Sequence, residues 1–235
     1  MKVAVCLSGQ PRSFEKGYEY LKKNIIDEHD VDVFYHTWDY DDTLKMEIEY
    51  LYRPKACMYE KPLDEKYFLE TYPNPNPRFP PYITTSMYYS IFMGNHVFRK
   101  YCLTNNEKYD IVVKSRFDFA INRKFSFEEV QEYKVYVPNC RMNPQRTICN
   151  DQFAYGKPKA INLYSMTYQN IDRLVDAGFP YNGEELLSGN LQINGLVGEN
   201  LVYVDMNHPF MPDKYGSMRH SLIRDDFSQW NKLRG

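Results

Sequence analysis

The sequence predicts an α/β domain with a mixed, mostly parallel sheet and helices on both faces, a Rossmann-like plan. A short continuous apolar run, typical of a strand buried on both faces, begins at Val3, and further segments with the character of strands begin at Val31 and Ile111. Segments with helical spacing of apolar residues separate these runs, and this alternation favours a parallel sheet. A chain of 235 residues with 43% hydrophobic residues suits one domain, which we place over residues 1–235.

The first strand, Val3 to Leu7, stops at the polar turn from Ser8 to Ser13, and we expect it to lie centrally in the sheet. Ser13 has the side chain of a helix N-cap. The helix after it is predicted by apolar residues at intervals of four, three and four: Phe14, Tyr18, Leu21 and Ile25.

Residues 31–36 form the second predicted strand, residues 55–59 the third and residues 110–114 the fourth. A helix carrying Leu44, Ile48 and Leu51 separates the second strand from the third. A long helix over 84–103 precedes the fourth. Between them, residues 61–81 hold six prolines, which we expect to exclude regular structure. This segment is either a loop at the border of a binding cleft or only a connection.

The second half is predicted to contain a strand over 133–137 and helices over 158–166 and 169–177. A helix beginning near Glu184 and a strand over 201–204 follow. The tail from Met206 is polar and has no clear period, so we expect it to wrap over the domain.

Composition excludes several classes of protein. Lys and Arg number 29 against 31 Asp and Glu, a formal charge of −2, so a general nucleic-acid or membrane-surface protein is disfavoured. No run approaches the ~20 apolar residues of a membrane span, and the opening strand is unlike a signal peptide. We therefore expect a soluble, cytoplasmic protein.

Five scattered cysteines, odd in number and without a CxxC spacing, indicate neither a disulfide framework nor a zinc site. Cys140 and Cys149 could pair in an oxidising compartment. Reduced thiols are the favoured interpretation for a cytosolic protein.

The loops at the carboxyl ends of parallel strands are where ligands bind in such a sheet. The first of them contains Ser8, Gly9, Gln10 and Arg12. Gly9 allows close approach of the backbone, the following helix supplies free N–H groups, and Arg12 offers a fork for phosphate or carboxylate. The loop matches neither a Walker motif nor GxGxxG. A plain polar turn before a helix is the alternative.

A second candidate is Arg116-Phe117-Asp118, directly after the fourth strand. Asp118 could hold a divalent cation against a diphosphate, and Arg116 could do part of that work without metal. The alternative is an ordinary surface ion pair. The acidic stretch from Asp39 to Asp42 is better explained as a helix cap than as a metal site.

Asp151 is the third candidate, as a group that binds a sugar hydroxyl or acts as general base, although a helix or turn cap would give the same pattern. Glu184 and Glu185 open a predicted helix, so its dipole explains them at least as well as catalysis does. His220, in the late polar segment, could reach a metal or a diphosphate; a surface or packed histidine is the alternative.

Several of these segments together resemble a family of small viral and bacterial glycosyltransferases with the GT-A fold. They are the opening VAVCLSGQPRSF, residues 32–38, the strand end at 114–118, and Asn150 to Phe153 followed by Gly156. The resemblance covers most of residues 1–205. It is strongest in the first forty residues and at the Arg-x-Asp segment.

The resemblance implies transfer of a hexosyl or pentosyl group from a nucleotide-diphosphate donor to a hydroxyl of a glycan or similar acceptor. Residues 1–120 would form the nucleotide-binding half, and residues 121–235 the acceptor side and tail. A viral member would act in the host cytoplasm. The donor sugar, base, acceptor, stereochemistry and oligomeric state stay open.

In the GT-A pattern an Asp-x-Asp after the fourth strand holds Mn²⁺ or Mg²⁺. Here Arg116 replaces the first acid. Either Asp118 binds the ion with help from His220, or Arg116 takes over part of the charge neutralisation. Asp151 corresponds to the acceptor-side acid, a base in inverting members and a stabilising charge in retaining ones.

The loop from Ser8 to Arg12 would bind the nucleotide. The rival hypothesis is a non-catalytic nucleotide- or carbohydrate-binding module of the same fold, because the metal motif is altered. A nucleotidyltransferase is disfavoured, since neither a Gly-rich loop with a downstream Lys nor paired acids are evident.

Overall fold

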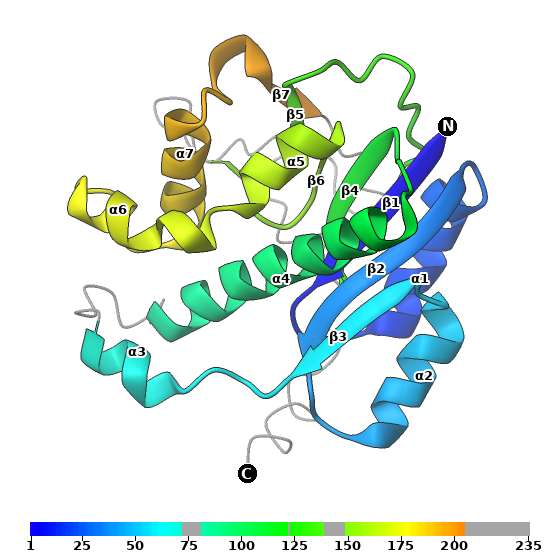
Figure 1. Ribbon diagram of the computed structural model, residues 1–235, viewed down its shortest axis with the longest axis horizontal. Helices are drawn as coiled ribbons and strands as arrows, with labels where there is room; N and C mark the ends of the chain where they lie inside the picture. The colour runs from blue at the N-terminus through cyan, green and yellow to red at the C-terminus, as the bar shows by residue number, and fades with distance from the viewer. Residues whose placement is uncertain (72–80, 122, 139–148, 205–235) are drawn as a thin grey trace, which may run out of the picture.

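The computed structural model describes residues 1–71, 81–121, 123–138 and 149–204 (Figure 1). Its centre is a seven-stranded sheet in the order β3-β2-β1-β4-β6-β5-β7. Neighbouring strands are parallel except where β6 is antiparallel to β4 and β5. The strands are β1 (Lys2–Ser8), β2 (Asp30–Trp38), β3 (Ala56–Glu60), β4 (Ile111–Arg116), β5 (Val135–Pro138), β6 (Ala154–Gly156) and β7 (Leu201–Val204).

Helices cover both faces of the sheet (Figure 1). One face packs against α4 (Pro81–Asn105), α5 (Pro158–Ser165), α6 (Ile171–Asp176) and α7 (Gly183–Ile193). The other packs against α1 (Phe14–Leu21), the following π-helical turn (Lys22–Ile26) and α2 (Asp42–Tyr52). Alternate residues of β1 serve the two cores, with Ala4 and Cys6 facing α4 and Val3, Val5 and Leu7 facing α1. The predicted fold class is confirmed.

Two glycines allow helices to approach the edge where the candidate site lies. A Cβ on Gly94 of α4 would stand 3.0 Å from the carbonyl oxygen of Leu7, so α4 lies directly on β1. A Cβ on Gly17 of α1 would stand 1.7 Å from the carbonyl oxygen of Phe117. Only glycine fits that position, because backbone atoms cannot yield as a flexible side chain can. The first turns of α1 are thereby held against the loop that follows β4.

Most predicted elements are present with shifted ends, and β1 is interior as expected. The exclusion of regular structure from residues 61–81 was wrong for α3 (Glu65–Thr71). The prolines at 62 and 73 bracket this short helix without entering it, and Pro81 occupies the first position of α4, where its missing N–H has no intrahelical partner to lose. Residues 72–80 and the tail from Met206 lie outside the described residues.

Cap assignments were right at α2 and wrong at α1. The Asp41 side chain accepts a hydrogen bond from the Leu44 N–H at 2.8 Å, so the acidic stretch caps α2 as predicted. Ser13 precedes α1 but makes no capping hydrogen bond with its side chain. Its backbone is left-handed, with φ of 45°, in place of the extended conformation that an N-cap adopts.

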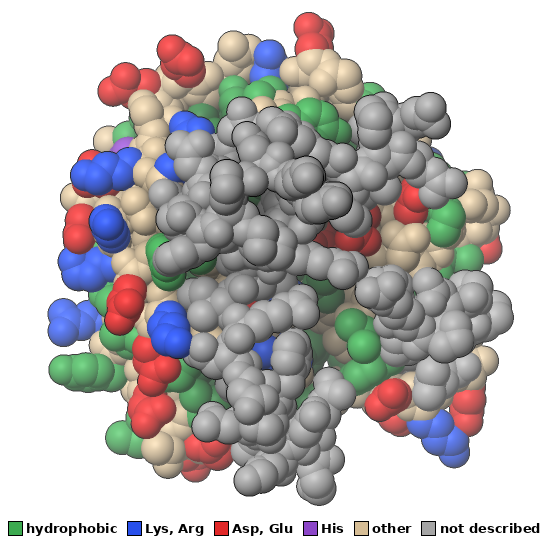
Figure 2. All heavy atoms as spheres, turned by 180° about the vertical axis from the view of Figure 1, so that it is seen from behind, with side chains coloured by type: hydrophobic (Ala, Val, Ile, Leu, Met, Phe, Trp, Pro, Cys, Tyr) green, Lys and Arg blue, Asp and Glu red, His purple; other side chains and the backbone are tan. Residues whose placement is uncertain are grey.

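Acidic and basic side chains are interspersed on the described part of the face in Figure 2, in keeping with the small net charge. Among the described helices, none combines the length and the apolar character of a membrane span. Cys6, Cys57 and Cys102 are free thiols. Cys140 lies outside the described residues, so the alternative of its pairing with Cys149 stays open.

Candidate functional site

The carboxyl ends of β1, β2 and β4 meet at one edge of the sheet. Ser8 at the end of β1 pairs in register with His36 on one side and with Arg116 on the other. The turn that contains Gly9 therefore emerges between the end of β2 and the Arg116–Asp118 segment. This edge brings two of the three predicted loops together, as a parallel sheet requires.

A set of polar contacts holds the Gly9 turn; we call it the Gly9 network. Gly9 has a left-handed backbone with φ of 95°, which favours glycine. Its N–H donates to Ser90 Oγ of α4 at 2.7 Å, and its carbonyl accepts from Thr37 Oγ1 at 2.9 Å. The remaining members are His36, Glu60 and Tyr89. The Gly9 N–H is therefore used inside the protein and is not offered to a ligand.

His36 connects the network to the edge strand β3. Its Nδ1 lies 2.8 Å from Ser90 Oγ, and its Nε2 lies 2.9 Å from Glu60 Oε2. The same carboxylate oxygen accepts from the Tyr89 hydroxyl at 2.9 Å. Burial lowers the pKa of His36 to about 4, although Glu60 acts in the opposite direction. The imidazole is therefore neutral at pH 7.

Ser90, His36 and Glu60 have the connectivity of an acyl-transfer triad, but they cannot act as one. Ser90 is 0% exposed, and its Oγ already contacts both Gly9 and His36. A nucleophile must reach a substrate carbonyl, and no part of this hydroxyl is accessible to one. These three residues therefore hold the backbone of the Gly9 turn in place.

Arg116 and Asp118 form a two-pronged ion pair, with Nε to Oδ1 at 2.7 Å and Nη2 to Oδ2 at 2.8 Å. Asp118 is 2% exposed, whereas the Arg116 side chain is 26% exposed. Phe117 is buried and anchors the segment in the core, with its ring centroid 5.5 Å from those of Tyr35 and Tyr52. Arg116 and Asp118 thus pair with each other, as the ion-pair alternative predicted, but the carboxylate is buried and does not lie at the surface.

Metal binding finds little support in the donor set at this position. Both oxygens of Asp118 accept from Arg116, so a cation would have to compete for them. Within the described ranges no group of three His, Cys, Asp or Glu side chains is placed to hold a metal. His220 lies outside those ranges. Metal dependence stays a prediction, and we assign it no step of a mechanism.

Lys114 is a site residue that sequence reasoning missed. It lies in β4, is 2% exposed, and its Nζ donates to the backbone carbonyl of Asp151. Burial lowers the pKa of Lys114 to about 7, against the effect of the Asp151 carboxylate, which raises it. The one signal in the sequence is a lysine directly after the apolar residues Ile111 to Val113, and it does not by itself reveal the partner of Lys114.

The Asp151 carboxylate lies against the N-terminus of α7. Its Oδ2 is 2.8 Å from the point where a Cβ on Gly183 would stand, so the glycine makes room for the carboxylate. The positive end of a helix dipole stabilises a negative charge at such a place. The turn itself is capped by Asn150, whose Oδ1 accepts from the Gln152 N–H at 2.7 Å. The turn cap is therefore Asn150, whereas the place of the Asp151 carboxylate at the start of α7 agrees with the helix-cap alternative as well as with a role in chemistry.

Four ionisable side chains thus come together, and we call them the charged cluster: Lys114, Arg116, Asp118 and Asp151. Asp151 and Asp118 both act electrostatically on Lys114 and on Arg116. Asp151 and the Arg116–Asp118 segment, 33 or more residues apart in sequence, therefore lie close together, because Lys114 of the same strand as Arg116 donates to the Asp151 carbonyl.

The other residues that the sequence predicted or considered for the site lie in the turn after β1 and at the start of α7. Ser8 is buried, and Gln10 and Arg12 are half-buried in the turn after β1. Glu184 and Glu185 occupy the first turn of α7, whose N-cap is Asn182, with its Oδ1 2.9 Å from the Glu185 nitrogen. This confirms the helix-dipole explanation for their place in the chain.

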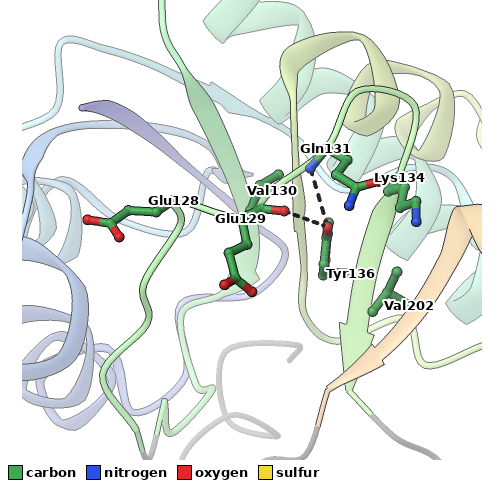
Figure 3. Close-up of a pocket in the computed structure, with 7 residues that line it drawn as sticks. All are labelled: Glu128, Glu129, Val130, Gln131, Lys134, Tyr136 and Val202. Carbon is green, nitrogen blue, oxygen red and sulfur yellow. Dashed lines mark hydrogen bonds between the residues drawn. The ribbon is translucent and has the colours of Figure 1, made fainter.

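A separate hollow of about 540 Å³ lies beside β5 and β7 (Figure 3). Its walls include Tyr136, whose hydroxyl lies 3.3 Å from both the Gln131 nitrogen and the Glu129 carbonyl oxygen. Most lining residues belong to the segment that enters β5, toward the amino end of that strand. The hollow is therefore not formed by the loops of the carboxyl edge.

No protein-family model and no curated protein sequence matches the chain. Among solved structures, it is similar to the galactosyltransferase LgtC in complex with donor and acceptor sugar analogues. The TM-score is 0.51 at 9% sequence identity, and the match covers 87% of this chain and 73% of the other. At this identity the likeness concerns the fold. The chain has a GT-A, Rossmann-like fold, as its sheet order and its helices on both faces indicate.

Proposed function

We propose that the protein is a glycosyltransferase that moves a hexosyl or pentosyl group from a nucleotide-diphosphate sugar to a hydroxyl of a glycan or similar acceptor. The observation that carries this proposal is the charged cluster at the carboxyl edge of a GT-A fold. Ligands of open α/β sheets bind at this edge. Two cations and two carboxylates there meet the requirements of a reaction that expels a diphosphate and moves one proton.

The donor half of the site is the turn after β1 together with Arg116. The turn that contains Ser8, Gly9, Gln10 and Arg12 leaves β1 between the ends of β2 and β4. We expect it to contact the nucleotide, but not through the Gly9 N–H, which donates to Ser90. Negative charge grows on the departing diphosphate, and preorganised cations lower the free energy of that transition state. Asp118 holds the guanidinium of Arg116 in a fixed orientation, so Arg116 could supply this charge without a metal.

Asp151 is the acceptor-side group in this proposal. Its backbone is tied to Lys114, and its carboxylate is positioned by Gly183 at the start of α7. A carboxylate so placed can take the acceptor proton or stabilise positive charge on the sugar ring. Taking the acceptor proton corresponds to a reaction that inverts the configuration of the anomeric carbon. Stabilising the charge corresponds to a reaction that retains this configuration.

The solved structure of LgtC contains donor and acceptor sugar analogues. The likeness of fold supports an equivalent use of the carboxyl edge in this chain, as an inference from fold to site. The donor base and sugar are left to experiment.

A thermal-shift panel of uridine and guanosine diphosphate sugars, each with Mn²⁺ and with EDTA, tests the proposal. A ligand at about a hundred times its Kd adds about 2.7 kcal/mol to the free energy of unfolding. We expect one nucleotide sugar to raise the melting temperature and to be hydrolysed slowly. The Asp151→Ala variant should keep the shift while turnover falls about 100-fold or more. Absence of any shift across the panel would refute the proposal.

The second candidate is a non-catalytic nucleotide- or carbohydrate-binding module. The observation that favours it is Arg116 at the place of the first acid of the Asp-x-Asp pattern, paired with Asp118. Saturable binding without turnover on any acceptor, and no effect of Asp151→Ala, would favour the module over the enzyme.

A further inference from the structure

The Gly9 network contains buried polar groups that the proposed chemistry does not use. It crosses from the edge strand β3 through β2 and α4 to the turn after β1. His36 and Ser90 are both 0% exposed, so neither reaches a ligand directly. Buried polar groups are costly unless their hydrogen bonds are complete, and this set needs a physical explanation.

The donors and acceptors of the network have one consistent direction. A carboxylate only accepts, so the His36 Nε2 facing Glu60 must carry the hydrogen. The Nδ1 of the neutral ring then accepts, and Ser90 donates its hydroxyl hydrogen to it. Ser90 Oγ is left as the acceptor for the Gly9 N–H at 2.7 Å. In the reversed tautomer Ser90 would turn its hydroxyl hydrogen to the His36 carbonyl oxygen, 3.3 Å away, but His36 Nε2 would face the Glu60 carboxylate with no hydrogen between them.

Glycine at position 9 needs this support. A Cβ there would meet nothing within 4 Å, so the residue is required for its φ of 95° and not for space. Glycine also has the greatest conformational freedom in the unfolded chain, so the turn has little preference of its own. The bonds from Ser90 and Thr37 select one conformation for it.

We propose that His36, held as the neutral Nε2–H tautomer by Glu60, is a positioning residue that acts through Ser90 to preorganise the Gly9 turn for a nucleoside diphosphate. The ligand in this inference rests on the proposed function, whereas the tautomer and the fixed turn do not. A preorganised turn binds more tightly because less ordering remains to be done on binding.

Ser90→Ala removes the connection with a minimal change of volume, and Ser165→Ala is its matched control. Ser165 is also a buried helical serine, and its hydroxyl only donates to the Ile161 carbonyl of its own helix at 2.8 Å. We expect Ser90→Ala to raise the Kd for the nucleoside diphosphate about tenfold or more, and Ser165→Ala to leave it unchanged. Equal Kd values for the two variants would overturn the inference.

Two measurements by NMR need no ligand. Nitrogen chemical shifts of the His36 ring should show a protonated Nε2 and an unprotonated Nδ1 at pH 7. Hydrogen exchange at the Gly9 amide should accelerate about tenfold or more in Ser90→Ala and stay unchanged in Ser165→Ala. A protonated Nδ1, or a Gly9 amide as slow as in the parent protein, would refute the positioning role. If no nucleotide binds at all, the proposed function fails while these two results still decide the role of His36.

Discussion

The Gly9 network and the charged cluster occupy adjacent strand ends of the same sheet edge, yet they solve the burial of polar groups in opposite ways. In the Gly9 network His36 is the only buried ionisable group, and it stays neutral. The negative charge of Glu60 is not buried, because the Glu60 side chain is 34% exposed. In the charged cluster, Lys114 and Asp118 are each 2% exposed. The first arrangement avoids buried charge and the second accumulates it.

The difference distinguishes neutral polar groups, which hold the structure in place, from buried charged groups, which are suited to catalysis. Neutral hydrogen bonds hold a backbone turn at modest cost. Burying charges costs free energy that an ion pair often fails to return, so stability alone does not explain the cluster. Charge in a water-poor site is what a diphosphate and a moving proton require. We therefore expect the two regions to respond differently to substitution and to pH.

The largest effect is expected from Asp118→Asn. The substitution leaves the Arg116 guanidinium without the carboxylate that both of its prongs contact, and breaking a buried pair in this way costs about 3–5 kcal/mol. Urea denaturation should show this loss, and the nucleotide-induced thermal shift should disappear. Glu28→Gln, which removes the carboxylate of an exposed pair with Lys124, is the control and should cost little. Comparable losses in both variants would remove the distinction between buried and exposed pairs.

The network should weaken in acid. The pKa of His36 is lowered to about 4 in the folded protein, from about 6.5 when unfolded. Between these values the unfolded state binds more protons, so the free energy of unfolding falls as pH falls from 6.5 toward 4, by up to about 3 kcal/mol.

Denaturation of the parent protein and of His36→Gln across pH 4–7 measures this effect. The glutamine does not titrate, so the curve of the variant should be flatter in this window. Parallel curves would mean that His36 is not the group responsible.

The charged cluster should respond with the same sign but in a higher pH range. The pKa of Lys114 is lowered to about 7 from 10.5, so above pH 7 the folded protein loses this proton while the unfolded chain keeps it. The free energy of unfolding should then rise with pH, by at most about 1.4 kcal/mol per unit. Lys114→Met keeps a similar stem without the charge. Its stability at pH 7 should equal or exceed that of the parent protein, and the rise between pH 7 and 8.5 should be absent.

A parent protein whose stability does not rise relative to Lys114→Met in that range would show that Lys114 keeps its proton. Turnover of Lys114→Met should fall even though stability does not. That split would distinguish a residue that holds the Asp151 backbone for chemistry from one that only supports the fold.

The smallest effect is expected from Gly183→Ala. A Cβ there would lie 2.8 Å from the Asp151 Oδ2 and would push the carboxylate aside. Alanine favours a helix over glycine by up to about 1 kcal/mol, so stability should hold or rise. Turnover should fall about tenfold because of the displaced carboxylate. A fully active variant would show that the position of Asp151 is not critical.

The regular elements were accessible from sequence because they depend on local patterns. Val3 to Leu7 and Ile111 to Val113 are apolar without interruption, and such runs identify buried strands whatever surrounds them. The prediction failed at α3 because the six prolines were taken to exclude a helix from the whole segment. Proline breaks a helix only when it falls in the helix interior.

The sequence predicted site residues by one rule, which is that ligands bind in the loops at the ends of the strands. Arg116, Asp118 and Asp151 follow from that rule, and the structure brings them into one cluster. Glu60, Ser90 and Lys114 did not follow, because each looks like an ordinary residue of a strand or helix until its partner is known.

The amino-acid sequence by itself determined the alternation of strands and helices and the polar loops at the strand ends, since both depend on neighbours within a few positions. Only the tertiary structure decided which groups are neutral and which are charged. Ionisation depends on burial and on partners such as Glu60 for His36, 24 residues apart, and Asp151 for Lys114, 37 residues apart. Desolvation and electrostatic interaction act through space, so the order of residues along the chain does not reveal them.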